Sequence, residues 1–218
     1  MQVMLASANP AKILELKDIL GQAGIEVIGL GDRSSTEEIE TGSTFTENAL
    51  LKARHYRKVS GLPTIADDSG LEVETLGGEP GVHSARYGGP GASDADRVNK
   101  LLDKLRNVPH DRRQCRFVCV AAIAWDGGER TFMGESSGSI VTEPRGQGGF
   151  GYDPVFFYQP LGRTFAELTA AEKAEVSHRG RAFRKLVTWL RASGALDTPT
   201  SGDRIENPIE VPSLAPKR

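Results

Sequence analysis

Two adjacent carboxylates, Asp67 and Asp68, are the residues of this sequence best suited to hold a divalent cation. Mg²⁺ is usually bound by one or two carboxylates together with substrate phosphates. Neighbouring side chains of an extended strand point to opposite faces, so we expect one aspartate to bind the metal while the other caps or supports the site. An aspartate-rich turn with ordinary capping roles is the alternative. The apolar residues Ile65 and Ala66 favour a site, because they bury the approach to the carboxylates.

A second candidate is the segment 7–12, which follows a short apolar run and precedes a helical pattern. Asn9 suits a helix N-cap, and Pro10 suits the first helical position. A helix N-terminus presents free backbone N–H groups to an anion, and Lys12 adds a cation. The segment lacks the glycines of a Walker A loop, and capping alone would also explain Asn9 and Pro10. By itself it is therefore a weak indication of phosphate binding.

Glu40 lies shortly before a predicted capped helix that carries Lys52. Thr44 and Glu47 have the spacing of a capping box at the start of this helix. If the helix lies beside the first one, a carboxylate for a metal and a lysine for a phosphate would converge. A surface glutamate and a solvated lysine are the alternative, which the local pattern alone favours.

The glycine-rich segment 148–154 could approach a ligand closely, because glycine leaves the backbone exposed. Phe150 could stack on a base, an interaction worth about 1–3 kcal/mol per base. Asp153 could accept hydrogen bonds from base N–H groups. A β-bulge with Phe150 buried in the core explains the same pattern equally well.

The fifth candidate is Lys173 together with His178 and Arg179, where the short helix predicted after Thr169 is interrupted before the last helix. Arginine offers fixed donors to an acceptor such as a purine O6, and Lys173 could contact phosphate. A helix junction capped by Ser177, with its charges in water, is the strong local alternative.

The elements that position these residues alternate between strands and helices, which predicts an α/β protein. A turn at Asp126 joins two β-like runs into a hairpin, so the sheet should be mixed. The strand before Asp67 is expected to end there, and residues 31–44 and 76–91 are expected to be loops. Strands are predicted at 3–6, 26–30, 63–66, 71–75, 115–125, 131–140 and 155–158, and helices after Asn9, Thr44, Ser93, Thr169 and Ser177.

The composition of the chain argues against some classes of protein and favours a globular one. A formal net charge of -2 argues against a duplex nucleic-acid binder, and 38% hydrophobic residues predict a packed core. We see no secretory signal and no apolar run of membrane-spanning length, which predicts a cytoplasmic protein. Cys115 and Cys119 lie in an apolar run and are expected to be free buried thiols. Residues 1–196 should form one domain, and 197–218, with four prolines, a disordered tail.

Taken together and in this order, the motifs resemble those of the inosine triphosphate pyrophosphatases, also called XTP/dITP diphosphatases. The resemblance extends from Met1 to about Leu190. Ala8 stands where the family more often has glycine. The motifs that carry the resemblance are Ser7-x-Asn9-x-x-Lys12, Glu40-Thr41-Gly42, Glu47-Asn48-Ala49 with Lys52-Ala53, Ile65 to Leu71, Pro80-Gly81, Ser84 to Tyr87, Gly148 to Pro154 and Ser177 to Gly180.

The resemblance implies an elongated mixed β-sheet with helices, two lobes flanking a substrate groove, and a homodimer. It implies Mg²⁺-dependent hydrolysis of ITP, dITP and XTP to the monophosphate and pyrophosphate. Glu40 and Asp68 would hold Mg²⁺, with Asp68 also the general base, Ser69 on the substrate and Lys52 on a phosphate. The other implied substrate-binding residues are Ser7, Ala8, Asn9, Pro10, Ala11 and Lys12 at the triphosphate, and Phe150, Gly151, Tyr152, Asp153, Lys173, His178 and Arg179 around the nucleotide.

Charge and hydrogen bonding suggest how such a site would work. Lysines and Mg²⁺ would neutralise the triphosphate, and Asp68 would deprotonate the attacking water. Donors such as Arg179 would be satisfied by O6 of hypoxanthine or xanthine but left unpaired by adenine. A related pyrophosphatase with another base preference and a non-catalytic nucleotide sensor are the alternatives. The presence of Glu40, Asp68 and the lysines counts against the sensor.

Overall fold

The computed structural model describes residues 2–30 and 39–194, and within them seven strands form one sheet in the order β2-β1-β3-β4-β5-β6-β7. β1 pairs in parallel with β2 and β3, whereas all neighbours from β3 to β7 are antiparallel. The predicted mixed α/β fold is therefore confirmed. The predicted tail and residues 31–38 of the predicted loop lie outside the described residues. The strands are β1 (Gln2–Ala6), β2 (Glu26–Ile28), β3 (Thr64–Val73), β4 (Gln114–Trp125), β5 (Gly128–Ile140), β6 (Phe156–Tyr158) and β7 (Arg163–Thr164).

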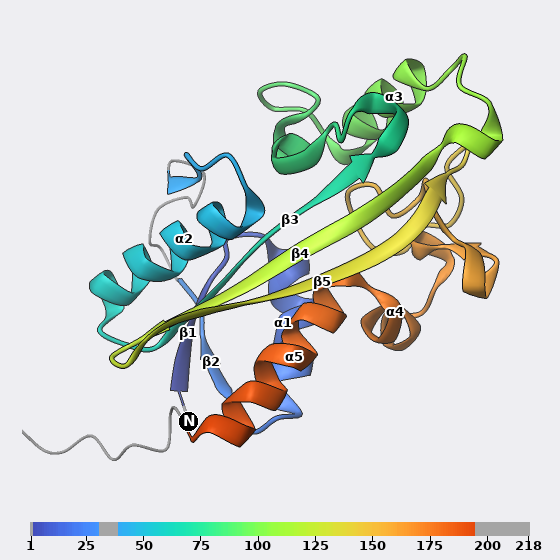
Figure 1. Cartoon of the computed structure of the whole chain (residues 1–218). Helices are drawn as coiled ribbons and strands as arrows, with labels where there is room; N and C mark the ends of the chain where they lie inside the picture. Colours follow the sequence, from blue (N-terminus) through green and yellow to red (C-terminus); the bar gives the residue numbers. More distant parts are fainter. Residues whose placement is uncertain (1, 31–38, 195–218) are drawn as a thin grey trace, which may run out of the picture.

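Helices cover both faces of the long strands. Figure 1 shows α2 on one face of β3 and β4, with α1 and α5 on the other and α3 near the far end. None of the helices in the described ranges is long and apolar enough to cross a membrane. The helices are α1 (Pro10–Gly21), α2 (Phe45–Ser60), α3 (Asp94–Lys104), α4 (Ala170–Val176) and α5 (His178–Ser193), with short 3₁₀ turns η2 (Glu74–Leu76), η3 (Gly81–Arg86), η4 (His110–Arg112), η5 (Gln159–Leu161) and η6 (Phe165–Glu167).

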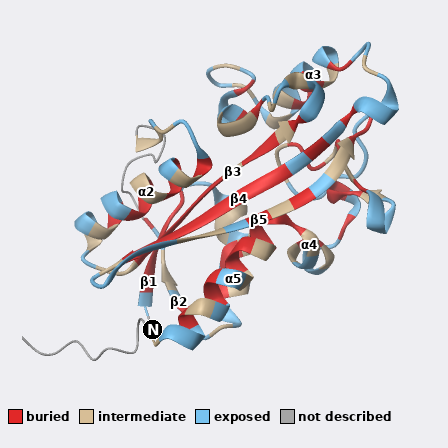
Figure 2. Ribbon diagram, in the orientation of Figure 1, coloured by how far each residue is buried: buried red, intermediate tan, exposed pale blue. Residues whose placement is uncertain are grey.

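The core consists of three clusters that follow from this arrangement. Alternate β3 residues point to opposite faces, so Ile65 packs with α1 and α5 while Ala66 packs with α2. A third cluster, which includes Leu71, joins the far end of β3 to α3 and β6. Figure 2 shows the resulting band of buried residues along β3 and β4. Cys115 and Cys119 are free and buried in β4, as predicted.

The strand that carries the two aspartates is longer than the sequence indicates. β3 runs without interruption through Asp67 and Asp68, so the prediction that a strand ends at this pair is wrong. Each β3 residue pairs with β4 in antiparallel register, with Asp67 opposite Ala121 and Asp68 opposite Val120. This pairing satisfies the backbone groups of a segment whose composition otherwise favours a turn. The two carboxylates are therefore held by the middle of the sheet.

The predicted loop 76–91 contains the folded turn η3, which lies directly against β3. Ser84 Oγ accepts a hydrogen bond from Leu71 N (2.9 Å) and donates one to Gly81 O (2.7 Å). A Cβ atom at Gly70 would lie 2.3 Å from Gly81 O, so glycine is required for this close approach. The segment thus has a fixed place beside the aspartates.

Candidate active site

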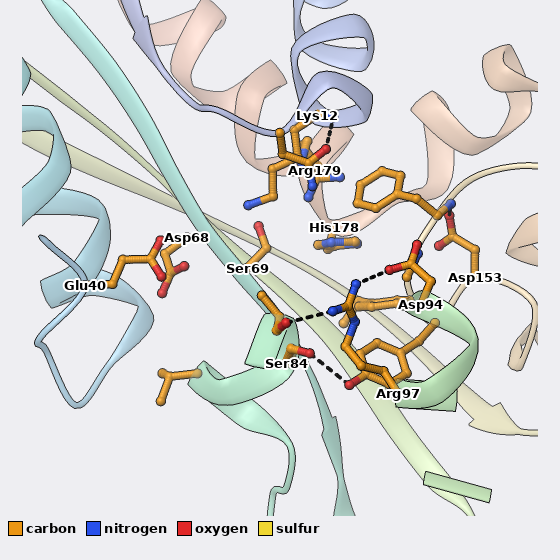
Figure 3. A pocket seen from close by; sticks show the side chains of 18 of the residues that line it. Lys12, Glu40, Asp68, Ser69, Ser84, Asp94, Arg97, Asp153, His178 and Arg179 are labelled. Carbon is orange, nitrogen blue, oxygen red and sulfur yellow. Dashed lines mark hydrogen bonds and ion pairs between the residues drawn. The ribbon is translucent and has the colours of Figure 1, made fainter. Parts of the chain in front are cut away.

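A cavity of about 130 Å³ lies beside the middle of β3 and collects most of the residues singled out from the sequence. In Figure 3, Glu40 and Asp68 lie at one side of it, Asp153 at the opposite side, and Lys12 and Arg179 along a third. Lys52 does not line the cavity, and neither do the segment 7–8 and residues 10–11. The lining residues are Asn9, Lys12, Glu40, Asp68, Ser69, Gly70, Val82, Ser84, Ala85, Asp94, Arg97, Phe117, Phe150, Gly151, Tyr152, Asp153, Lys173, His178 and Arg179.

The start of α1 brings Lys12 into the cavity. Asn9 caps the helix as predicted, because its side chain accepts from Ala11 N (2.9 Å) and Lys12 N (3.2 Å), and Pro10 is the first helical residue. The ammonium of Lys12 lies 3.0 Å from Asp67 Oδ2. The helix end therefore supplies a cation and its dipole to this side of the cavity.

The side chains of the two adjacent aspartates point to different faces of the sheet, as their neighbouring positions on one strand predict. Asp67 contacts Lys12, and it also accepts from Ser69 Oγ (2.8 Å). Asp68 faces α2, where it accepts from Asn48 Nδ2 (3.1 Å). Burial alone would raise the pKa of Asp67, but the charges of Lys12 and Arg179 outweigh it and hold this pKa well below its usual range.

Glu40 and Asp68 converge on one buried ammonium. Lys52 Nζ lies 2.6 Å from Glu40 Oε1 and 3.5 Å from Asp68 Oδ1, and the Lys52 side chain is only 3% exposed. Burial raises the pKa of Asp68; Lys52 opposes this shift and Glu40 adds to it. Lys52 therefore acts from behind the two carboxylates, and it is not free to reach a ligand in this arrangement.

Glu40 and Asp68 are the residues that could hold a hard divalent cation. No group of three or more His, Cys, Asp or Glu side chains arranged for a metal occurs in the described ranges. Two carboxylates with hard oxygen donors are, however, the protein share of a typical Mg²⁺ site, in which substrate phosphates and water supply the other ligands. Glu40 and Asp68 thus have the chemistry of such a donor set, since both line the cavity.

Phe150 lines the cavity next to Asp153. Asp153 Oδ2 accepts from Phe150 N (2.9 Å) and also contacts the ammonium of Lys173. Lys173 Nζ lies 4.7 Å from the centre of the Phe150 ring, and the Arg179 guanidinium lies 5.4 Å from it. Phe150 is half-buried in an irregular segment, so the alternative of a β-bulge with this ring in the core is wrong.

The start of α5 places the last two predicted residues. Ser177 caps the helix by accepting from Gly180 N (3.0 Å), as the sequence indicates. His178 stacks on Phe117 with ring centres 4.6 Å apart, and Arg179 is nearly fully buried. Burial, together with the charges of Arg179 and Lys173, lowers the pKa of His178 well below its usual value, so the imidazole is neutral at pH 7.

Comparison with known proteins decides the family. The model of the Ham1 family matches residues 3–189. The chain belongs to this family. It is 48% identical over 193 residues to the dITP/XTP pyrophosphatase of Shigella flexneri (87% of this chain, 98% of that protein), and 50% identical over 188 residues to that of Thermus thermophilus (86% and 90%). The solved Ham1 protein of Staphylococcus aureus superimposes with a TM-score of 0.79 at 40% identity, covering 88% of this chain and all of that one.

These matches confirm the family resemblance, and the structure shows two residues next to the cavity that the sequence reasoning missed. Glu15 on α1 accepts from Lys173 Nζ (2.8 Å) and Arg179 Nη1 (2.7 Å). Its position three residues after Lys12, on the same face of the helix, is a signal that could have identified it. Asp94 accepts from Gly151 N (2.6 Å), a contact that no local pattern reveals.

Proposed function

We propose that this chain hydrolyses the non-standard purine nucleoside triphosphates ITP, dITP and XTP to the monophosphate and pyrophosphate. The observation that supports this proposal most directly is that one cavity is lined both by two carboxylates, Glu40 and Asp68, and by the Phe150 ring with the Arg179 guanidinium near it. Such a cavity offers a place for phosphates and a place for a base. The names of the relatives, dITP/XTP pyrophosphatases, support two of these substrates, dITP and XTP.

Charge balance supports a divalent cofactor, and we propose Mg²⁺. The cavity lining contains four carboxylates and four cationic side chains, which cancel one another. A polyanionic triphosphate therefore needs further positive charge to enter. Glu40 and Asp68 would hold the ion. When bound, Mg²⁺ neutralises phosphate charge and polarises ligated oxygens.

Phosphate binding, support of the two carboxylates and proton transfer are assigned to different side chains. Lys12, at the start of α1, binds phosphate oxygens, while Ser69 lies beside it on β3. Lys52 contacts phosphate only if it leaves Glu40, so we assign it the support of the two carboxylates. Asp68 takes a proton from the attacking water.

We assign the recognition of the base to Phe150 and Arg179. The Phe150 ring stacks on the purine, and Arg179 donates to O6 of hypoxanthine or xanthine. Adenine carries an amino group there and would leave the N–H donor that faces O6 without an acceptor, which costs about 1–3 kcal/mol for a buried donor. Tyr152 and Asp153 hold the segment in place, with Tyr152 Oη donating to Ser84 O (2.9 Å).

The same proposal includes the extent of the domain, the cellular location and the oligomeric state. Residues 1–196 would form one two-lobed catalytic domain, an assignment supported by the match to 98% of the Shigella relative. The protein would act in the cytoplasm as a homodimer, without nucleic acid or membrane. Light scattering after size-exclusion chromatography tests the dimer.

Pyrophosphate release tests the proposed activity. ITP, dITP, XTP, GTP, ATP and dUTP are each incubated with the full chain, with Mg²⁺ and with a chelator. Fast release from the first three substrates, dependent on the metal, is expected. Preference for dUTP would instead favour a pyrophosphatase for other bases, and binding of ITP without release would favour a nucleotide sensor.

A further inference from the structure

The Asp67 carboxylate touches three elements of the site, although it does not line the cavity. It is 1% exposed and lies behind the cavity wall on the α1 and α5 face of β3. Its partners are Lys12 on α1, Ser69 on β3 and Arg179 on α5, each of which lines the cavity. A single buried group therefore touches three side chains that line the cavity, each supplied by a different element.

The contacts converge on one oxygen. Asp67 Oδ2 lies 3.0 Å from Lys12 Nζ, 2.8 Å from Ser69 Oγ and 3.6 Å from Arg179 Nε. The other oxygen, Oδ1, is buried without a hydrogen-bond partner among the described residues. All three contacts are made by the same oxygen atom. A movement of Lys12 that shifts Asp67 Oδ2 therefore also changes the distance from this oxygen to Arg179.

We propose that Asp67 is a positioning residue that couples the phosphate side of the site to the base side. This inference rests on the proposed function, in which Lys12 binds phosphate and Arg179 binds the base. Through Asp67 the two cations keep a fixed separation, so a nucleotide finds both contacts already placed. A purely structural carboxylate would stabilise the fold without linking the two binding contacts.

Two ligands test the phosphate contact and the base contact separately: inorganic triphosphate, which has no base, and inosine, which has no phosphate. We expect Asp67→Asn to weaken both ligands about tenfold, since contacts to charged groups contribute on this scale. The KM for ITP should rise more than kcat falls. Asp67→Glu, which restores the charge, should recover part of the affinity.

The matched control is Glu72→Gln, which removes a carboxylate from the same strand outside the cavity, where Glu72 pairs with Arg116. It should leave both affinities unchanged. Weakening of only one ligand by Asp67→Asn, or a lowered Tm with both affinities intact, would overturn the coupling. If wild-type protein binds neither ligand and releases no pyrophosphate, the proposed function itself fails.

A second measurement applies even if Asp67→Asn does not fold. Lys12→Met alters a side chain at the first turn of α1, and inosine carries no phosphate for Lys12 to bind. We expect inosine binding to weaken severalfold nevertheless, because Asp67 loses a partner and Arg179 shifts with it. Unchanged inosine affinity in this variant contradicts the proposal.

Discussion

Lys52 Nζ lies 2.6 Å from Glu40 Oε1, and this contact joins the middle of α2 to the segment that precedes it. The same ammonium lies 3.5 Å from Asp68 Oδ1. Burial alone would lower the pKa of Lys52, but Asp68 and Glu40 outweigh it and raise this pKa, so the side chain stays charged. A buried cation thus holds together the two carboxylates proposed to bind the metal.

Lys52→Met should lower stability strongly, because it leaves two neighbouring carboxylates without their cation. Breaking a buried pair typically costs about 3–5 kcal/mol. Added Mg²⁺ should raise the Tm of this variant more than that of wild type, since the ion replaces the missing charge. Thermal unfolding with and without Mg²⁺ measures both effects. Lys104→Met, which breaks an exposed pair with Glu79, is the control and should change Tm little.

Asp68→Asn should reduce turnover far more than binding. Removing a general base commonly lowers kcat by about 100- to 10,000-fold. The amide keeps the size of the side chain but is a weaker Mg²⁺ ligand, so the affinity for ITP should fall far less than turnover does. Pyrophosphate release under saturating ITP and equilibrium binding of ITP distinguish the two effects. Near-normal turnover in this variant would contradict the assignment of Asp68 as the base.

The local signals in the sequence predicted the helix starts more reliably than the sheet. Asn9 and Ser177 both cap helices where expected, because capping depends on neighbours within three residues. The strand through Asp67 was missed, since its pairing partner lies more than fifty residues away in β4. Contacts such as Lys173 with Glu15 were also missed, because only the packing of α1 against α4 and α5 brings them together.

Gly134→Ala should separate α5 from the sheet. A Cβ atom at this position would lie 2.2 Å from His178 O and 2.4 Å from Ala182 N, and neither backbone atom can move alone. Overpacking of this kind costs about 1–3 kcal/mol or more. We expect a lower Tm and a higher KM for ITP, since the start of α5 carries His178. Gly21→Ala, where a Cβ meets nothing within 4 Å, should be neutral or slightly stabilising.

His178 should not titrate in the physiological range. Burial, with the charges of Arg179 and Lys173, holds its pKa well below the usual value, so the neutral imidazole persists as the pH falls. Its ring signals in NMR spectra should therefore show no midpoint near pH 6.5, where an unperturbed histidine changes charge. His178→Gln identifies these signals by their loss. A midpoint near the ordinary histidine value would show that the ring is hydrated.

Asp67 should make the fold sensitive to acid. Its pKa is lower in the folded state than the value of about 3.9 expected in the unfolded chain, so its stabilising contribution is complete above pH ~4 and is lost as the pH falls further. Asp153, whose pKa is raised by burial, affects stability with the opposite sign, but it is present both in wild type and in Asp67→Asn.

Urea unfolding of wild type and Asp67→Asn between about pH 2.5 and 7 measures the difference. Wild type should be the more stable at pH 7, and its advantage should shrink below pH ~4, because Asp67 of the unfolded chain takes up a proton there while Lys12 and Arg179 still hold it ionised in the folded protein. A constant difference in the free energy of unfolding across this range would mean that the carboxylate keeps its ordinary pKa, and that its attraction to the two cations does not stabilise the fold.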